Sequence, residues 1–417
     1  MRTLRSTLVR ALALGAALLL APAVQAADPI KIGLSMSLTG GLGGGGKSAL
    51  LAMQIWRDDV NAKGGLLGRQ VELVSYDDQS NPATVPAIYT KLLDIDKVDL
   101  VVSSYATNQI APAMPIVMQR KLTFMALFGT GVNDTFKYDR YFQILPNGKE
   151  TRLAPSLGFL ETAMTMNPKP QTIALVGADA EYAQTVIAGA RETVAKLGLK
   201  VVYDRSYPPT TTDFTPIVRA IQAANPDVVF VASYPPDSVG IVRAANEVGL
   251  KPKMFGGGMI GLAFTPIKGQ LGPLLNGIVA YDVYVPEPTM KFPGIEDFLS
   301  RYQTKAAQQG VDPLGYYLPP YAYAEMQILG EAITKVGSLD QSKIADYIHK
   351  TSFKTIVGDV KFADNGEWEK GRVLFVQYQG VVGNDVKQFS QVGKQVILYP
   401  PEYKSGNFIY PYSDIKK

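Results

Sequence analysis

Cysteine is absent from the 417-residue chain, and histidine occurs once, at position 349. Without cysteine the chain forms no disulfide and offers no thiol nucleophile or thiol-linked lipid anchor. One histidine provides no His/Cys cluster for zinc or copper, and a Ser-His-Asp triad would depend on it alone. His349 lies in a helical stretch and is expected to be a packed or surface residue. The sequence therefore predicts no metal site, no cofactor and no catalytic residue.

Long apolar runs are also scarce, and the only conspicuous one is Ala11–Ala21. It follows three arginines within the first ten residues and precedes the small-residue sequence Val24-Gln25-Ala26. These features predict a secretory signal peptide over residues 1–26, cleaved near Ala26. The three arginines carry three of the chain's four net positive charges. The exported chain is therefore nearly neutral, and no nucleic-acid partner is expected.

Short apolar runs alternate with longer amphipathic stretches, and this pattern occurs twice. Such alternation is typical of βαβ units with a parallel sheet. An exported chain of about 390 residues also exceeds the usual size of a single core. We therefore expect two α/β lobes, with crossings near Tyr141–Pro146 and Gly277–Asp282. The predicted boundaries are 28–145 and 280–356 for the N-terminal lobe, 146–279 and 357–399 for the C-terminal lobe, and 400–417 for a surface tail.

The stretch Gly41–Ser48 reads GLGGGGKS and fits G-x-x-x-x-G-K-[ST], the pattern of a phosphate-binding P-loop. Six of the seven residues from 40 to 46 are glycine, so composition alone can produce the match. No acidic residue ends a neighbouring strand to hold magnesium, and an exported protein has no ATP supply. We favour a flexible loop whose backbone approaches a ligand, followed by a helix over Ser48–Asn61. The paired acids Asp77 and Asp78 are expected to lie in a solvated loop.

Several stretches together resemble the periplasmic solute-binding proteins of ABC transporters for branched-chain amino acids, the type I or Venus flytrap class. They are IKIGLSMSLTG from Ile30, NAKGGLLGRQVELVSYDD from Asn61, DAEYAQT from Asp179, DFTPIVRAIQAANPDVVFVASYPPD from Asp213 and VGDVKFADNGEW from Val357. The resemblance covers nearly all of the exported chain. It implies an α/β fold of two lobes, each a parallel sheet flanked by helices, joined by three crossings. It also implies that the lobes close on a small ligand held by strand-end loops, and that the protein acts in the periplasm with a membrane permease as partner.

The resemblance further implies ligand contacts from both lobes. Those of the first lobe are Gly45, Tyr105, Ala106, Thr107, Phe128, Gly129 and Thr130. Those of the second lobe are Tyr182, Tyr234, Gly258 and Met259. Other interpretations remain open for three of them, because Phe128 suits a core and Thr107 and Thr130 suit helix or turn caps.

Two departures from the family pattern bear on the ligand. Amino-acid binders carry an acid near the segment GGGMIG to pair the ligand's ammonium, whereas this segment holds Gly258 and no acid. Relatives often place an aromatic residue where this chain has Gly45. Both changes are expected to enlarge the pocket and remove charge. We therefore predict a monomer that binds a small carboxylate with an aromatic or apolar body.

Three alternatives remain at this stage. The ligand could be an aliphatic branched-chain amino acid or amide, with Asp179 or Glu181 pairing its ammonium. The chain could be an enzyme, either nucleotide-dependent or a hydrolase, and the Lys47→Ala variant separates an NTPase from a solute binder. It could also be a sensor domain that presents its ligand to a membrane receptor.

Overall fold

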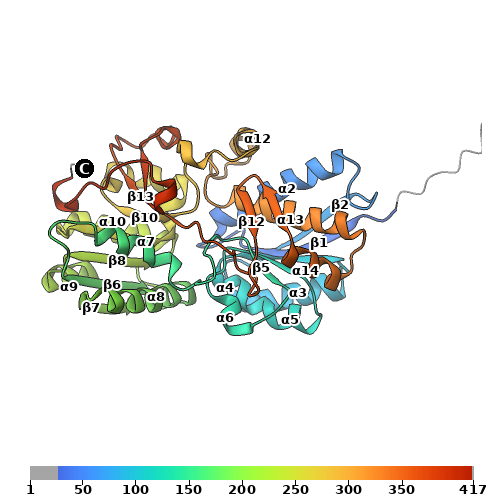
Figure 1. Cartoon of the computed structure of the whole chain (residues 1–417), viewed down its shortest axis with the longest axis horizontal. Coiled ribbons are helices and arrows are strands. Elements are labelled where there is room, and N and C mark those ends of the chain that lie inside the picture. Colours follow the sequence, from blue (N-terminus) through green and yellow to red (C-terminus); the bar gives the residue numbers. More distant parts are fainter. Residues whose placement is uncertain (1–26, 416–417) are drawn as a thin grey trace, which may run out of the picture.

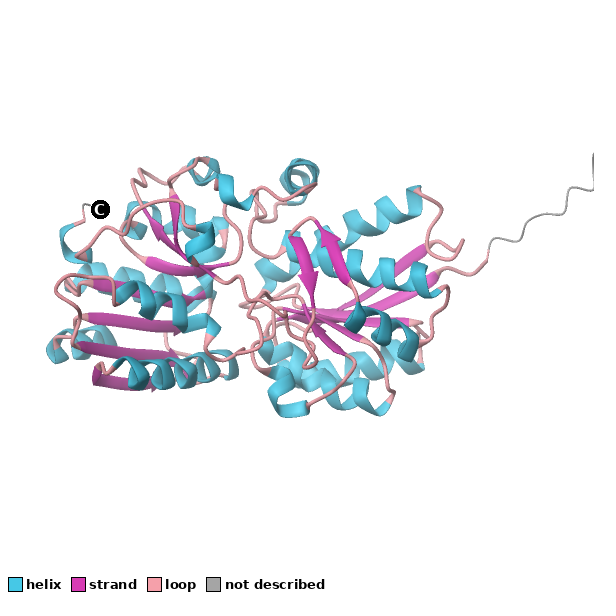
Figure 2. Cartoon of the chain, viewed as in Figure 1, coloured by secondary structure: helices cyan, strands magenta, loops and turns pink. Residues whose placement is uncertain are grey.

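Two lobes, each built on a β-sheet flanked by helices, lie side by side in the molecule (Figures 1 and 2). The computed structural model describes residues 27–415, so the signal peptide predicted over 1–26 lies outside the described residues. The expected α/β fold with two lobes is confirmed. Across residues 27–415, no helix combines the length and the apolar character that a membrane crossing requires.

The first sheet has the strand order β2-β1-β3-β4-β5, and all its pairs are parallel. Its strands are β1 (Ile30–Met36), β2 (Val71–Asp77), β3 (Leu100–Tyr105), β4 (Phe124–Leu127) and β5 (Tyr141–Gln143). Side chains alternate between the two faces, so Val101 and Phe124 enter one core cluster while Val102 and Met125 enter the other. Burial on both faces produces continuous apolar runs, which is why these strands are recognisable from sequence.

Helices cover both faces of this sheet. One face packs against α3 (Val85–Asp94) and α5 (Met114–Gln119), and the other against α2 (Gly43–Ala62) and α13 (Pro319–Val336). The remaining elements of this lobe are α4 (Thr107–Ile110), α6 (Val132–Phe136), α14 (Gln341–Lys350) and the hairpin of β11 (Ser352–Thr355) and β12 (Gly358–Lys361). Helix α12 (Ile295–Gln309) packs beside α2 and α13.

The second sheet has the strand order β14-β13-β10-β9-β8-β6-β7. Its strands are β6 (Thr172–Ala178), β7 (Lys200–Tyr207), β8 (Val228–Ser233), β9 (Met254–Met259), β10 (Val279–Asp282), β13 (Leu374–Tyr378) and β14 (Gln395–Tyr399). Strands β6 to β10 are parallel, whereas β13 and β14 each run antiparallel to their neighbours. The helices of this lobe are α7 (Ala154–Ala163), α8 (Glu181–Leu197), α9 (Thr215–Ala224), α10 (Pro235–Val248) and α11 (Thr265–Leu271).

The crossings between the lobes differ from those expected. Gly277–Asp282 was predicted to be a crossing, but β10 occupies most of it and pairs with both β9 and β13. The second passage therefore follows Asp282, and residues 280–282 do not belong to the first lobe. The hairpin strand β12 packs with the first lobe although 357–399 was assigned to the second, and Phe362 stacks on Phe142 with ring centroids 5.3 Å apart. Four-residue strands carry too little pattern to be separated from a linker.

The C-terminal tail packs on the second lobe. Tyr412 is 2% exposed, and its ring lies against Phe255 with centroids 5.3 Å apart. Gln377 on β13 accepts a hydrogen bond from the Ile409 backbone N–H at 2.9 Å. The tail therefore closes one end of the second sheet.

The glycine-rich stretch is helical rather than a loop, which corrects the sequence interpretation. Helix α2 begins at Gly43, five residues before the predicted start at Ser48, and no side chain caps it. Four successive glycines thus form its first turn, although glycine is the poorest helix former after proline. Close packing explains this choice, because a Cβ placed on Gly46 would lie only 1.8 Å from the Ser37 carbonyl oxygen.

Candidate functional site

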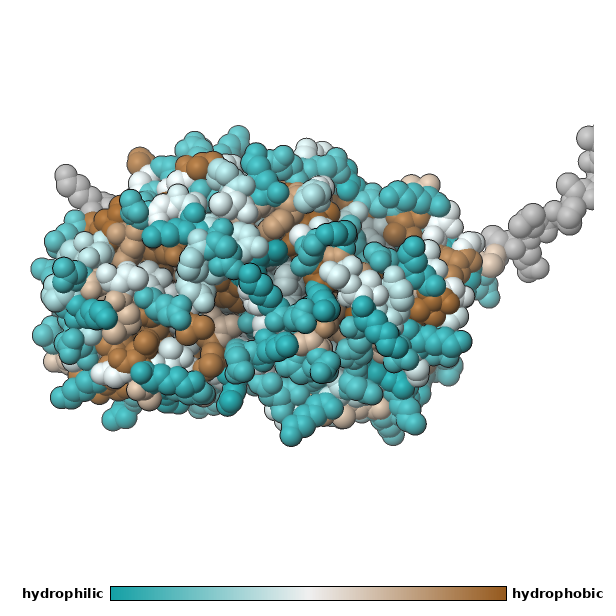
Figure 3. Space-filling model, viewed as in Figure 1, coloured by the Kyte–Doolittle hydropathy of each residue, from teal (hydrophilic) through white to brown (hydrophobic). Residues whose placement is uncertain are grey.

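The carboxyl ends of the strands in both sheets face the boundary between the lobes. In open α/β sheets, small molecules bind at this edge. The loops after β3 and β4 meet those after β6, β8 and β9 here. On the face shown in Figure 3 the surface is largely hydrophilic, with scattered apolar patches. Most of the aromatic residues at this boundary are buried, and Tyr234 is partly buried.

Hydrogen bonds join the two lobes at this boundary. The Asn108 side-chain oxygen, on α4 of the first lobe, accepts from the Tyr234 hydroxyl of the second lobe at 2.9 Å. It also lies 3.4 Å from the backbone N–H of Tyr182, which bonds to the Tyr234 hydroxyl oxygen at 3.2 Å. The rings of Tyr182 and Tyr234 stack edge to face, with centroids 5.8 Å apart. The lobes are therefore in direct contact at this boundary.

The two first-lobe loops predicted to contact a ligand hold each other in place. The Thr107 hydroxyl oxygen accepts from the Thr130 N–H at 2.9 Å. Gln143 on β5 accepts from the Phe128 N–H at 2.9 Å and donates to the Gly129 carbonyl at 2.8 Å. These bonds fix a backbone in which Ala106 and Phe128 adopt the left-handed region, with φ of 83° and 63°. Such conformations are costly for residues other than glycine and often mark functional loops.

Aromatic rings from both lobes gather around these loops. The Phe128 ring packs against Tyr317 and Tyr321, with centroids 5.1 Å and 5.2 Å away. Phe264 of the second lobe packs against Tyr317 at 5.0 Å and Tyr105 at 6.4 Å. Tyr105 is 1% exposed, and no group lies at hydrogen-bond geometry to its hydroxyl although Tyr317 lies close by. Burial raises the pKa of Tyr105, so the hydroxyl stays protonated and can donate.

The second-lobe residues Gly258 and Met259 lie at the end of β9. The Gly258 carbonyl accepts from the Tyr182 hydroxyl at 3.1 Å. A Cβ on Gly258 would lie 3.2 Å from that hydroxyl oxygen, so a larger residue would press on Tyr182. Met259 is completely buried. These contacts place Gly258 beside the tyrosine pair that meets Asn108.

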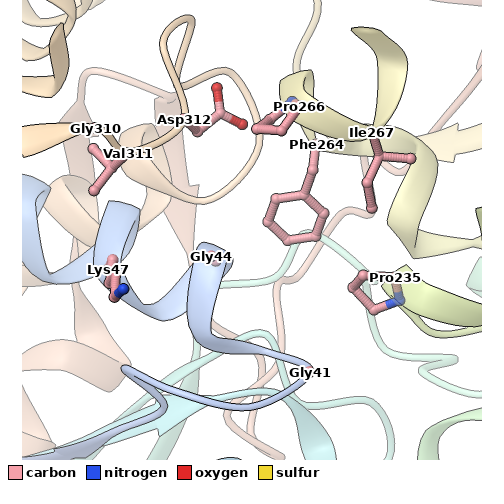
Figure 4. Close-up of a pocket in the computed structure, with 11 residues that line it drawn as sticks. Gly41, Gly44, Lys47, Pro235, Phe264, Pro266, Ile267, Gly310, Val311 and Asp312 are labelled. Carbon is pink, nitrogen blue, oxygen red and sulfur yellow. The ribbon is translucent and has the colours of Figure 1, made fainter. Parts of the chain in front are cut away.

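Gly45 faces the second lobe, but the space beside it is filled. A Cβ on Gly45 would lie 2.9 Å from the Phe264 ring and 2.9 Å from Leu318. Figure 4 shows the Phe264 ring directed toward the first turn of α2. Outside this contact lies a cavity of about 290 Å³, lined in part by Gly44, Lys47 and Phe264. Gly45 also lines this cavity, and the Phe264 ring fills part of the space that its missing side chain leaves.

Four acidic residues near the cleft are either paired or exposed. Asp282 is 1% exposed and lies 3.8 Å from the equally buried ammonium of Lys268. The Asp312 carboxylate accepts backbone N–H groups of Thr265 at 3.0 Å and Gly315 at 2.9 Å. Asp179 and Glu181, the acids suggested as ammonium partners, are both exposed. Within residues 27–415, no group of three or more His, Cys, Asp or Glu residues could hold a metal ion.

The paired acids Asp77 and Asp78 shape the first-lobe edge rather than lying in a solvated loop. Asp78 is fully buried and accepts from the hydroxyls of Ser35, Ser37 and Ser104 at 2.9, 2.5 and 2.8 Å. Asp77 accepts from the Leu38 N–H at 2.9 Å and the Thr39 hydroxyl at 2.7 Å. Together they tie the ends of β1, β2 and β3 to the segment that leads into α2.

Comparison with known proteins shows which family the chain belongs to. The sequence pattern of the family described as periplasmic binding protein matches residues 29–380. The chain belongs to this family. It is 26% identical over 409 residues to a Leu/Ile/Val-binding protein homolog of Brucella abortus, covering 93% of this chain and 96% of the relative.

Two solved structures share the fold of this periplasmic binding protein. One is the branched-chain amino acid transporter substrate-binding protein of Streptococcus pneumoniae in complex with isoleucine, with TM-score 0.73 and 19% identity over 89% of this chain and 100% of that one. The other is a solute-binding protein of an R. palustris ABC transporter in complex with 4-hydroxybenzoate, with TM-score 0.71 and 20% identity over 89% of this chain and 95% of that one. The family resemblance inferred from the sequence is confirmed.

Sequence reasoning missed three residues at the lobe boundary. Asn108 directly follows the predicted contact Thr107, and its side chain links the lobes. Phe264 and Tyr317 lie outside the quoted motifs, and only the fold brings them together. An aromatic residue that follows a short helical turn gives no signal of the distant glycine that it will contact.

Proposed function

We propose that this chain is the substrate-binding protein of an ABC importer. It is exported to the periplasm after cleavage near Ala26, captures a small carboxylate with an aromatic or apolar body by hinge closure, and delivers it to a membrane permease. The observation that carries the proposal is the cleft lining, in which aromatic rings and hydroxyl groups meet while the acids Asp282 and Asp312 already have partners. Closure between two rigid lobes is a familiar hinge motion.

The charges around the cleft favour a ligand without an ammonium group. A buried ammonium without a counter-ion is costly, so an amino-acid ligand needs an acid in contact with it. Lys268 already neutralises Asp282, and the carboxylate of Asp312 is occupied by backbone N–H groups. Asp179 and Glu181 are exposed, and the Asp179 carboxylate accepts a hydrogen bond from Gln184 at 2.6 Å.

Donors for a carboxylate are present on the first-lobe loops. The Tyr105 hydroxyl is buried and protonated, and the Thr107 hydroxyl, whose oxygen accepts from Thr130, still has its own proton to donate. Thr107 also begins α4, where backbone N–H groups have no preceding carbonyl. We assign carboxylate contacts to this loop. The other proposed ligand contacts are Gly45, Ala106, Phe128, Gly129, Thr130, Tyr182, Tyr234, Gly258 and Met259.

The descriptions of related proteins support the class of substrate-binding proteins, and they include two types of ligand. The R. palustris protein was solved with an aromatic acid, and the Streptococcus pneumoniae protein with isoleucine. We favour the aromatic acid because of the rings and the missing acid in this cleft. The alternative ligand is an aliphatic amino acid or amide, and its binding would replace the aromatic acid in this proposal.

Ligand screening by thermal unfolding separates the two. A ligand at one hundred times its Kd stabilises the folded state by about 2.7 kcal/mol, which raises the unfolding midpoint measurably. We expect midpoint increases with benzoate, 4-hydroxybenzoate and cinnamate, and none with leucine, isoleucine or valine. Large increases with the amino acids and none with the aromatic acids would refute the proposed ligand class. Native mass spectrometry of the purified protein identifies any ligand that is retained.

A conservative variant tests the proposed carboxylate donor. Tyr105→Phe keeps the ring but removes the hydroxyl, and we expect it to weaken binding of 4-hydroxybenzoate roughly tenfold, as loss of a hydrogen bond to a charged group predicts. Tyr203→Phe on the edge strand β7 is the matched control and should bind normally. Equal affinities of the two variants would remove Tyr105 from the site.

A further inference from the structure

The Phe264 side chain belongs to the second lobe but is buried among residues of the first. It lies between β9 and α11 in the chain, and it is 6% exposed. Its ring meets Tyr105 at the end of β3 and Tyr317 just before α13, with centroids 6.4 Å and 5.0 Å away. Both partners belong to the first lobe. The ring can therefore occupy this position only when the lobes are closed.

Two adjacent glycines at the start of α2 differ in what they face. A Cβ on Gly45 would lie 2.9 Å from two atoms of the Phe264 ring, a distance that requires something to move. A Cβ on Gly44, one residue earlier in the same helical turn, would have no neighbour within 4 Å. The requirement for glycine at position 45 thus comes from side chains outside the helix, Phe264 of the other lobe and Leu318 of the same lobe, whose side chain would also lie 2.9 Å from the added Cβ.

We propose that Gly45 and Phe264 form a matched pair that permits closure and determines ligand specificity. Gly45 leaves the space that the Phe264 ring enters as the lobes close. The ring then forms the second-lobe wall beside the Tyr105 hydroxyl, where it contacts a flat ligand body. The specificity role rests on the proposed function, whereas the closure role depends only on the contact between Gly45 and Phe264.

The absence of cysteine from the chain allows closure to be measured without a ligand. Gly41 and Pro236 face each other across the boundary, and a Cβ on Gly41 would lie 3.8 Å from the Pro236 Cγ. In a Gly41→Cys/Pro236→Cys parent, a disulfide forms under mild oxidation only when the lobes meet. The rate of disulfide formation therefore reports how often the closed arrangement occurs.

Four further changes in this parent test the pair. Gly45→Val should slow disulfide formation roughly tenfold, because the side chain overlaps the Phe264 ring. Gly44→Val, with the same change in helix propensity, should leave the rate within about twofold of the parent. Phe264→Ala alone should disulfide-link at least as fast as the parent. Adding Phe264→Ala to Gly45→Val should restore the rate, because the two residues are energetically coupled.

Several results would overturn the closure proposal. They are a normal rate in Gly45→Val, an equal defect in Gly44→Val, failure of Phe264→Ala to restore the rate, or no disulfide in the parent. Far-UV circular dichroism and thermal unfolding establish that each variant is folded. If Gly45→Val does not fold, the comparison of Phe264→Ala with the parent still tests the proposal.

Ligand binding is measured separately in chains without the introduced cysteines. Phe264→Ala should weaken 4-hydroxybenzoate binding roughly tenfold. The ratio of its affinities for 4-hydroxybenzoate and cyclohexanecarboxylate should also differ from that of the unsubstituted chain. If Phe264→Ala binds both acids as the unsubstituted chain does, the specificity role is wrong. If the unsubstituted chain binds neither acid, the proposed ligand class fails, and the disulfide rates still decide the closure role.

Discussion

The Asn108 side-chain oxygen accepts a hydrogen bond from the Tyr234 hydroxyl at 2.9 Å, and this bond crosses from one lobe to the other. Asn108 follows the Thr107 loop, while Tyr234 immediately precedes α10. The backbone N–H of Tyr182 joins the same pair. Closure therefore brings together one acceptor on the first lobe and two donors on the second, beside the predicted ligand contacts.

Removing the Tyr234 hydroxyl should weaken closure. We expect Tyr234→Phe to release ligand roughly five to ten times faster, because a neutral hydrogen bond contributes about 1 kcal/mol and affinity changes appear mainly in the dissociation rate. Stopped-flow dissociation of the ligand found in the screen measures this. Tyr76→Phe is the control, since its hydroxyl bonds to Asp96 at 3.0 Å within the first lobe. Equal dissociation rates in the two variants would contradict the role of the cross-lobe bond.

The glycines of the first turn of α2 should respond differently to alanine. Gly46→Ala places a Cβ 1.8 Å from the Ser37 carbonyl oxygen, and we expect a loss of about 3 kcal/mol or more in the free energy of unfolding. Gly44→Ala meets no atom and should gain about 0.5–1 kcal/mol, because alanine favours a helix. Urea unfolding of both variants measures the difference. Similar free energies for the two would show that this turn is not helical in solution.

The elements of the fold could be predicted because most strands are buried on both faces. Val101, Val102, Phe124 and Met125 lie in two core clusters, so their apolar runs stand out in the sequence. Short elements could not be predicted in this way. The strand Val279–Asp282 has only four residues, and its place in the second sheet depends on pairing with β9 and β13.

The candidate site was only partly accessible from the sequence. Resemblance to a family indicated the loops around Tyr105, Phe128 and Tyr182, because strand-end motifs are local. The contact between Gly45 and Phe264 is not local, and neither residue type indicates the other. The role of Asp78 was missed for the same reason, since its three serine partners come from β1, β3 and the segment after β1.

Asp78 should matter far more for stability than its neighbour. Asp78→Ala removes a buried acceptor from three serine hydroxyls and leaves them unpaired, so we expect a loss of about 3–5 kcal/mol in the free energy of unfolding. Asp77→Ala, at a partly exposed position, should cost about 1 kcal/mol. Chemical denaturation provides both values. Equal losses would show that the buried serine network does not hold the strand ends.

The buried pair of Lys268 and Asp282 should give the protein a measurable pH dependence. Burial raises the pKa of Asp282 to about 6 from its ordinary 3.8, against the opposing effect of the Lys268 ammonium. Between these two values the folded state holds a proton that the unfolded state has released. The contribution of Asp282 to stability is therefore present below pH 4 and is lost as the pH rises through 6. The loss amounts to at most about 3 kcal/mol, at 1.36 kcal/mol for each pKa unit.

Comparison with an uncharged variant isolates this contribution. The free energy of unfolding of Asp282→Asn should fall less between pH 4 and 7 than that of the unsubstituted chain, because asparagine does not titrate. Asp359→Asn, at an exposed ion pair with Lys354, is the control and should keep the original slope. Urea unfolding at half-unit pH steps provides the curves. If Asp282→Asn and the unsubstituted chain have parallel curves, Asp282 is ionised in the folded state down to its ordinary pKa.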